Sequence, residues 1–148
     1  MKVSELMTKK LVTVTQDDML DKVFSHFYFG GIRHIPVVTD KGALIGIISD
    51  RDAKKMLGPK QTSYVQKDGT TLTVSARKAR TIMRRKPITI GPDEKAADAA
   101  VIMVKNNISA LPVVRNKKLV GIITATDILK AFIKLTNMVD KFSQSLEK

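Results

Sequence analysis

The sequence predicts an α+β fold in which one β-α-β-β-α unit occurs twice along the chain. Residues 6–52 align on residues 82–127 at an offset of 76, which falls to 75 after one deletion in a turn. Within each copy, apolar residues at helical spacing alternate with short runs of β-branched residues. Two copies are too few for a solenoid, so we expect a pseudo-symmetric pair whose small sheets each pack on two helices.

The repeat divides the 148 residues into four parts. We predict a first repeat over 1–57, a basic linker over 58–80, a second repeat over 81–135 and a C-terminal helical tail over 136–148. Within the linker, residues 71–74 have the composition of a short strand.

Each half is expected to begin with a short β-branched strand, over 12–14 and over 88–90. A helix follows in each half. Thr15 and Asp18 resemble a capping box at the start of the first helix, and Gly30-Gly31 ends it. Pro92 suits the first turn of the corresponding second helix, and Asn106-Asn107 ends that helix.

Two apolar strands joined by a tight turn come next in both halves. In the first half residues 35–38 and 44–48 form the predicted hairpin, and in the second half residues 115–118 form its turn. Another helix is expected to begin near Asp50 and near Ala125. These elements complete the β-α-β-β-α order in each copy.

The end of the second repeat and the C-terminal tail carry apolar residues that alternate four and three positions apart, a spacing typical of a coiled coil. The stripe consists of Ile128, Phe132, Leu135, Val139, Phe142 and Leu146. Two interpretations remain open at this point: the stripe packs on the chain's own body, or it forms a dimer contact.

Composition excludes several classes of protein. The chain has no cysteine, which rules out a disulfide framework, thiolate zinc ligands and a cysteine nucleophile. Its two histidines are too few for a histidine cage, so we expect no metal. It has no run of 18 apolar residues, so we expect no transmembrane helix. Its first residues lack an apolar stretch, so we expect no signal peptide. We therefore expect a cytoplasmic protein without membrane contact.

The net charge of +12 favours anionic partners. Six of the ten residues over 77–86 are basic, namely Arg77, Lys78, Arg80, Arg84, Arg85 and Lys86. This segment is either a solvated linker or a phosphate-binding surface for nucleic acid. Because no aromatic residue is interleaved to stack bases, nucleic-acid binding is the alternative function rather than the leading one.

The clearest chemical signal is a Ser/Thr-x-x-Asp motif that follows an apolar strand and begins a helix, as Ser49-x-x-Asp52 and as Thr124-x-x-Asp127. One interpretation is a capping box, in which the hydroxyl accepts a free helix N–H. The other is a ribonucleotide site. There the helix N-terminus attracts phosphate, and the carboxylate accepts two hydrogen bonds from the ribose diol.

The ordered duplication resembles a tandem pair of CBS (cystathionine β-synthase) domains, the Bateman module. In the first repeat the resemblance rests on Leu6-Met7, Thr13, residues 30–38 and residues 46–52. In the second repeat it rests on Ile82-Met83, Thr89, residues 108–114 and residues 121–127. Together the repeats cover most of the chain.

The resemblance implies a regulatory module that binds AMP, ADP, ATP or S-adenosylmethionine as its ligand and holds no catalytic cofactor. The family's ribose-binding pair falls on Asp52 with Ser49 and on Asp127 with Thr124. Its first-strand threonine falls on Thr13 and Thr89. Its base-contacting segment falls on Ile32, Arg33, His34, Ile35 and Pro36, and on Ile108, Ser109, Ala110, Leu111 and Pro112.

The family pattern also implies that each cleft draws on both repeats. Ser49 and Asp52 would face Thr89 and residues 108–111, and Thr124 and Asp127 would face Thr13 and residues 32–35. The two clefts differ. Arg33 and His34 replace Ser109 and Ala110, and Arg51 replaces Thr126. We expect the clefts to differ in the number of phosphates they prefer. The alternatives also remain open that His34 is a structural imidazole and that Arg51 is a solvated side chain at a helix start.

We expect no enzymatic activity, because the sequence shows neither a recognisable nucleophile-base-acid arrangement nor a Walker loop. The leading interpretation is a ligand sensor. Its partner would be a separate effector protein or a second copy, since pairs in this family often associate into a flat disc of four CBS domains.

Overall fold

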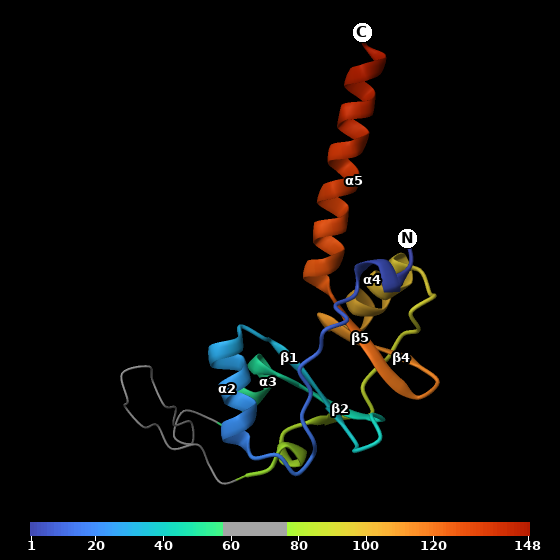
Figure 1. The fold of residues 1–148 in the computed structure, drawn as a ribbon. Coiled ribbons are helices and arrows are strands. Elements are labelled where there is room, and N and C mark those ends of the chain that lie inside the picture. The colour runs from blue at the N-terminus through green and yellow to red at the C-terminus, as the bar shows by residue number, and fades with distance from the viewer. Residues whose placement is uncertain (58–76) are drawn as a thin grey trace. The chain divides into compact units, whose positions relative to one another are not determined.

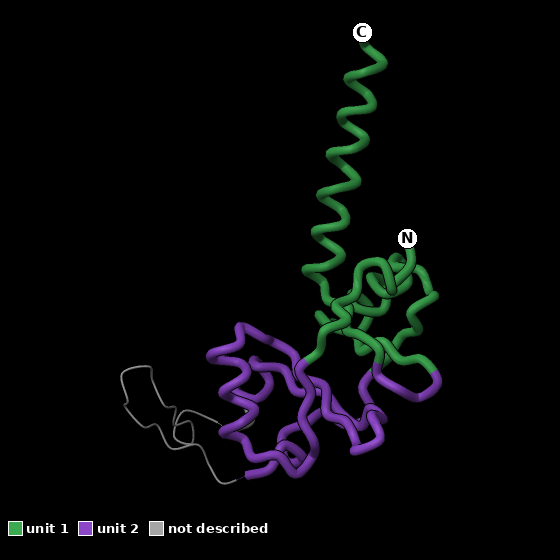
Figure 2. The backbone as a smooth tube through the Cα atoms, in the orientation of Figure 1, with its two compact units in different colours: residues 1–11, 88–115, 120–148 green, residues 12–87, 116–119 purple. Residues whose placement is uncertain are grey.

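The computed structural model describes residues 1–57 and 77–148, and these residues form two compact units (Figure 2). Unit 1 contains Met1–Leu11, Ile88–Arg115 and Val120–Lys148. Unit 2 contains the described part of Val12–Pro87 together with Asn116–Leu119. The strand predicted over 71–74 and most of the linker predicted over 58–80 lie outside the described residues.

Unit 2 is built on a three-stranded antiparallel sheet with the order β1 (His34–Val38), β2 (Leu44–Ser49), β3 (Arg84–Arg85). Figure 1 shows the β1–β2 hairpin, which confirms the hairpin expected from the sequence. Its register places His34 opposite Ser49 and Ile35 opposite Ile48. The first residue of β1 and the last residue of β2 therefore lie side by side.

Two helices flank this sheet in the sequence, α2 (Leu20–Gly30) and α3 (Asp50–Leu57). Helix α2 ends at Gly31 with a left-handed φ of 63°, as the glycine pair predicts. The predicted N-cap is wrong, because the helix begins only at Leu20. The Asp18 carboxylate instead accepts the Thr15 N–H at 2.8 Å in a turn that precedes the helix.

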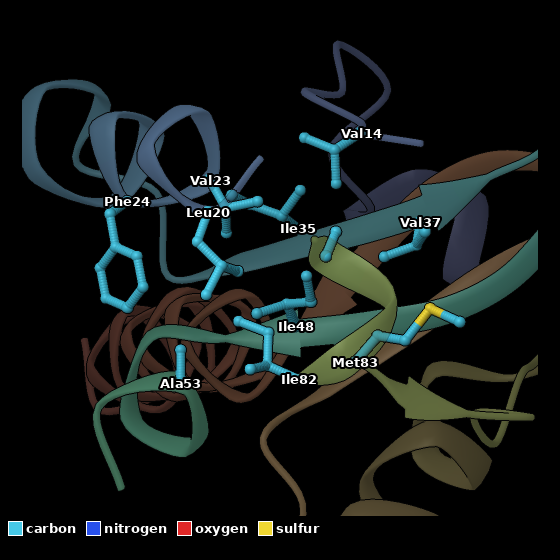
Figure 3. Packing of buried hydrophobic residues seen from close by; sticks show 11 residues of the cluster. Val14, Leu20, Val23, Phe24, Ile35, Val37, Ile48, Ala53, Ile82 and Met83 are labelled. Carbon is cyan, nitrogen blue, oxygen red and sulfur yellow. The ribbon is translucent and has the colours of Figure 1, made fainter. Parts of the chain in front are cut away.

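The core of unit 2 lies between α2 and the sheet (Figure 3). Leu20, Val23 and Phe24 share one face of α2 and are fully or almost fully buried. They pack with β-strand residues and with residues 79–83, at the start of the second repeat. This core consists of Val14, Leu20, Val23, Phe24, Ile35, Val37, Ile48, Ala53, Ala79, Ile82 and Met83.

The second repeat repeats this plan with α4 (Ala96–Asn106), β4 (Ala110–Arg115), β5 (Lys118–Thr124) and α5 (Ala125–Leu146). The two-residue turn between β4 and β5 places Asn116 and Lys117 at positive φ, 51° and 64°. This is the backbone of the primed turns that suit hairpins, and it confirms the predicted turn.

The predicted start of the helix in the second repeat is wrong, and the predicted first strands of both repeats are shorter than expected. Helix α4 ends as predicted, with Asn107 at φ 52°, but it begins at Ala96, so Pro92 precedes it. The predicted first strands shrink to single parallel bridges, Val14 to Val37 and Ile90 to Val113. They stop there because the chain turns at once, with Asp18 N–H bonded to Thr15 O and Glu94 N–H bonded to Gly91 O.

The two repeats exchange short segments, so that the first residues of each repeat pair with the rest of the other repeat. In unit 1, Thr8 and Ile122 exchange backbone hydrogen bonds of 2.8 and 3.0 Å, and α1 (Val3–Leu6) places Val3 in the core. In unit 2, β3 pairs Arg84 with Ile47. Compact units and sequence repeats therefore have different boundaries.

Helix α5 runs without interruption from Ala125 to Leu146, so the predicted tail over 136–148 continues a helix of the second repeat (Figure 1). Ile128 packs on the core of unit 1, as one of the two interpretations expects. From Phe132 onward that interpretation is wrong for the described residues, because the stripe is exposed. Phe132, Val139 and Phe142 are 62%, 62% and 65% exposed.

Across the described ranges, no helix has the length and hydropathy needed to cross a bilayer.

Candidate functional site

In unit 2 the predicted Ser49-x-x-Asp52 motif lies where β2 ends and α3 begins. The Asp52 N–H donates to Ser49 Oγ at 3.0 Å, which is the capping bond that the sequence predicts. The carboxylate of Asp52 serves another contact. Its Oδ2 accepts a charged hydrogen bond from the Arg84 guanidinium at 2.9 Å.

In unit 1 the corresponding motif forms a complete capping box at the start of α5. The Asp127 N–H donates to Thr124 Oγ1 at 3.3 Å, and the Thr124 N–H donates to Asp127 Oδ2 at 2.9 Å. The Thr124 hydroxyl also lies 3.0 Å from that carboxylate oxygen. The two aspartates thus occupy equivalent positions with different partners.

In each repeat a backbone hydrogen bond fixes the helix start beside the segment that precedes Pro36 or Pro112. The Asp50 N–H donates to the Arg33 carbonyl at 2.9 Å in unit 2. The Ala125 N–H donates to the Ser109 carbonyl at 2.8 Å in unit 1. The predicted ribose-binding and base-contacting segments are therefore neighbours within each unit.

The first-strand threonines flank the same segments. Val14, next to Thr13, donates its N–H to the Pro36 carbonyl at 3.1 Å. Ile90, next to Thr89, donates its N–H to the Pro112 carbonyl at 3.1 Å. Thr13 is half-buried and Thr89 is exposed. Each unit therefore groups its own threonine, proline segment and helix start, while the predicted pairing across the two repeats stays a prediction.

The predicted base-contacting segments expose few side chains. Ile35, Pro36, Ala110, Leu111 and Pro112 are buried. Their side chains belong to the units' interiors, so these residues have only backbone groups to offer. Among the remaining positions, Ile32 and Ile108 are half-buried, and Arg33, Ser109, Arg51 and Thr126 are exposed.

His34 is the histidine of this region, and its pKa is shifted. It is half-buried at the start of β1, opposite Ser49. Burial lowers the pKa of the His34 imidazole below its ordinary value of 6.5. The nearby Asp50 and Asp52 carboxylates act in the opposite direction, and Arg33 adds to the lowering. His34 is therefore a neutral imidazole at pH 7, able to donate and accept a hydrogen bond.

Carboxylates partly neutralise the basic segment 77–86. Asp17 forms ion pairs with Arg80 and, at 3.6 Å, with Lys78. Arg84 pairs with Asp52. Sequence reasoning missed these pairs, because Asp17 lies far from the basic run in the sequence.

Among the described residues, no cluster of three or more histidine or acidic side chains is arranged to hold a metal ion.

The comparisons with known proteins match this duplicated architecture. The family model of the CBS domain matches the chain twice, over residues 3–58 and 79–134. The chain belongs to the CBS domain family. A CBS domain-containing protein of Dictyostelium discoideum is 32% identical over 140 residues, which cover 93% of this chain and 94% of that protein.

Solved CBS domain pairs share the fold. The pair of protein MJ0100, in complex with 5′-methylthioadenosine and S-adenosyl-L-methionine, is 28% identical with a TM-score of 0.74, covering 89% of this chain and 95% of that one. Protein MJ1225 from Methanocaldococcus jannaschii, a candidate archaeal homologue of g-AMPK, is 31% identical with a TM-score of 0.72. That match covers 88% of this chain and 47% of MJ1225.

Several curated relatives are longer than this CBS chain. It spans 31% of MJ1404 and 46% of MJ1225, both uncharacterised proteins of M. jannaschii that are 33% and 34% identical to it. It also matches 23% of a homoserine O-acetyltransferase of Methanococcoides burtonii at 33% identity. The similarity to that enzyme therefore covers a minor part of its length.

Proposed function

We propose that this CBS protein is a non-catalytic sensor that binds an adenosine-containing ligand, of the S-adenosylmethionine or adenine-nucleotide class, at the helix starts marked by Asp52 and Asp127. The observation that carries the proposal is the duplicated tie between each helix start and its proline segment, through the Asp50–Arg33 and Ala125–Ser109 hydrogen bonds. The complex of MJ0100 with two adenosyl compounds supports the ligand class.

The chemistry of the helix starts suits a ribose. A carboxylate at this position can accept hydrogen bonds from both hydroxyls of a vicinal diol, and these bonds are strengthened by its charge. The adjacent helix N-terminus favours a negatively charged or electron-rich group. Ser49 and Thr124 already cap the helices, so their hydroxyls hold the aspartates in place as well as lying near a bound sugar.

We call the helix start at Asp52 and the helix start at Asp127, each with its neighbouring side chains, the two half-sites. They are expected to prefer different ligands. Asp52 shares its half-site with Arg84, Arg33 and Arg51, whereas Asp127 lies in a capping box beside the uncharged Ser109 and Thr126. A ribose at Asp52 must compete with Arg84 or release its guanidinium toward a phosphate. We therefore expect the Asp52 half-site to favour the more anionic ligands, such as ADP or ATP.

Ligand binding acts as a signal only if a partner distinguishes the liganded conformation from the free one. We propose that the reader is a separate effector protein or a second copy of this chain in a homodimer, in the cytoplasm, where a cysteine-free chain is at no disadvantage. Nucleic-acid binding is not proposed, because Lys78, Arg80 and Arg84 are paired with carboxylates and nothing in the comparisons favours it.

Calorimetric titration of the full chain with AMP, ADP, ATP and S-adenosylmethionine tests the proposal. We expect saturable binding in wild type. Asp52→Asn and Asp127→Asn should each weaken one class of site by about tenfold or more, because each removes a charged acceptor. Asp17→Asn and Asp93→Asn are matched controls, since these carboxylates also pair with basic groups but lie outside the motifs.

The controls should bind like wild type. The proposal fails if none of the four ligands produces heat or raises the melting temperature. It also fails if the control variants lose as much affinity as the motif variants, because binding would then follow net charge rather than the two helix starts.

A further inference from the structure

The distal part of α5 exposes a continuous apolar stripe within unit 1. Figure 1 shows the helix continuing well beyond the other elements of that unit. From Phe132 onward every side chain of the stripe is 45% to 71% exposed. Most helical stability in proteins comes from packing of an amphipathic face, so this exposed apolar face calls for a partner.

The stripe follows the heptad rule of a coiled coil, with residues three and four apart falling on the two core positions. Phe132, Val139 and Leu146 take the first core position, and Leu135 and Phe142 take the second. The residues that flank these core positions carry no charge at all. The flanking residues are Leu129, Ala131, Thr136, Met138, Ser143 and Ser145.

Two of the three flanking hydroxyls, those of Thr136 and Ser145, already form hydrogen bonds inside the helix. The Thr136 hydroxyl donates to the carbonyls of Phe132 and Ile133 at 3.1 and 3.0 Å. The Ser145 hydroxyl donates to the Phe142 carbonyl at 2.7 Å. Both side chains can be covered by a second helix without losing hydrogen bonds to water, so the interface can extend beyond the core positions.

The charges of the helix lie on the opposite face. Lys130, Lys134, Asp140 and Lys141 all fall outside the core and flanking positions. Two identical helices with a positive net charge would repel one another if their lysines bordered the seam. Here the seam is free of charge, so like helices can pair, and a partner of opposite charge gains nothing at the seam.

We propose that α5 is a dimerisation helix, and that its occupant is α5 of a second copy of this chain in a two-stranded coiled coil. The contact is isologous: the same stripe on both copies covers itself, as closed two-fold symmetry requires. A membrane surface fits less well. Helices that lie on lipid carry basic residues beside the apolar face, whereas here the flanks are uncharged.

This inference does not rest on ligand binding. The dimer contact lies in α5 beyond the capping box, and the proposed ligand groups lie elsewhere in the two repeats. A failure of ligand binding leaves the dimer proposal standing, because oligomeric mass and ligand heat are separate readouts. A monomeric chain leaves ligand binding standing, with a separate effector protein as its reader.

Sedimentation equilibrium of the full chain, from low to high micromolar concentration, tests the proposal with two matched variants. Val139→Asp with Leu146→Asp places two carboxylates seven residues apart in the seam. Asn137→Asp with Gln144→Asp places the same charges at the same spacing on the opposite face. We expect the seam variant to have half the mass of wild type, and the control variant to keep the wild-type mass.

Circular dichroism gives a second readout that does not depend on mass. The helical signal of wild type should rise with concentration as the coil forms, and that of the seam variant should not. A wild-type monomer throughout the concentration range overturns the proposal. So does a seam variant that keeps the full wild-type mass, or wild-type protein that pellets with phosphatidylglycerol vesicles through this stripe while remaining monomeric.

Discussion

Two glycines at equivalent positions show how closely the exchanged segments approach the sheets. A Cβ on Gly46 would lie 2.8 Å from Met83 Sδ and 3.1 Å from the Arg84 carbonyl oxygen. A Cβ on Gly121 would lie 2.5 Å from Met7 Sδ and 3.1 Å from the Thr8 carbonyl oxygen. Because the backbone is one of the obstacles in each case, rotation of the methionine alone does not relieve the contact.

We therefore predict that Gly46→Ala and Gly121→Ala each lower the free energy of unfolding by about 1–3 kcal/mol, the usual cost of overpacking. Gly91→Ala is the control, since its Cβ would meet only the Glu94 side chain, which can move. Urea denaturation measures all three. If Gly121→Ala is as stable as Gly91→Ala, the close packing described here is incorrect.

At His34 the sign of the pH dependence follows from its lowered pKa. Between the folded pKa and the unfolded value near 6.5, the unfolded chain binds more protons than the folded chain. The free energy of unfolding should therefore fall as the pH drops from 7 through this window. His34→Asn should flatten that part of the profile, and identical slopes for wild type and variant would refute the assignment.

Residue-scale prediction from sequence succeeded for Ser49 and Thr124, because helix capping depends on contacts three residues apart. It missed the Arg84–Asp52 pair, whose partners are 32 residues apart. A repeat alignment does not indicate this pair, since the counterpart of Arg84 is Thr8. Long-range ion pairs depend on tertiary structure that local patterns do not encode.

Among the elements, α5 offers the cleanest test of a cap. Thr124→Ala removes the hydroxyl that accepts the Asp127 N–H, and we expect a loss of about 1 kcal/mol in the free energy of unfolding. Thr126→Ala, which removes an exposed hydroxyl two residues later, should cost less than half as much. Thermal denaturation of the two variants side by side decides whether the capping box stabilises the helix.

The predicted starts near Asp50 and Ala125 are confirmed for α3 and α5, but for α2 and α4 only the ends were predicted correctly. Gly31 and Asn107 both adopt the left-handed conformation at the C-termini, a requirement that few residue types meet easily. The starts of α2 and α4 lie several residues beyond Thr15 and Pro92, because the side-chain bonds of Asp18 and Glu94 close turns before the helices. The same residue types serve caps and turns, so sequence alone does not separate them.

For the whole molecule, the exchange of segments means that a core substitution in the first residues of one repeat should destabilise the other repeat. Val3 is fully buried in the core of unit 1, and Ile82 is buried in the core of unit 2. Val3→Ala should accelerate hydrogen exchange over 88–146, and Ile82→Ala over 12–57, with a cost of about 2 kcal/mol or more in each unit. Effects confined to each residue's own sequence repeat would contradict the exchange.

The internal repeat revealed the architecture of the whole chain, because duplicated motifs in the same order are far more specific than any one motif. It did not reveal the exchange, since an alignment of repeats assigns each segment to the copy that follows it. The exposed face of α5 was likewise left open, because heptad spacing alone does not say whether the covering surface is internal or a second chain.

We propose that Asp52 and Asp127 bind the ribose diol of an adenosine ligand, and a cycle of ligand and protein changes tests this contact. AMP and 2′-deoxy-AMP are titrated against wild type, Asp52→Asn and Asp127→Asn. We expect wild type to lose about tenfold in affinity for the deoxy ligand, and this loss to disappear at the site whose aspartate is replaced. Equal affinity of wild type for the two ligands would show that the aspartates do not bind the diol.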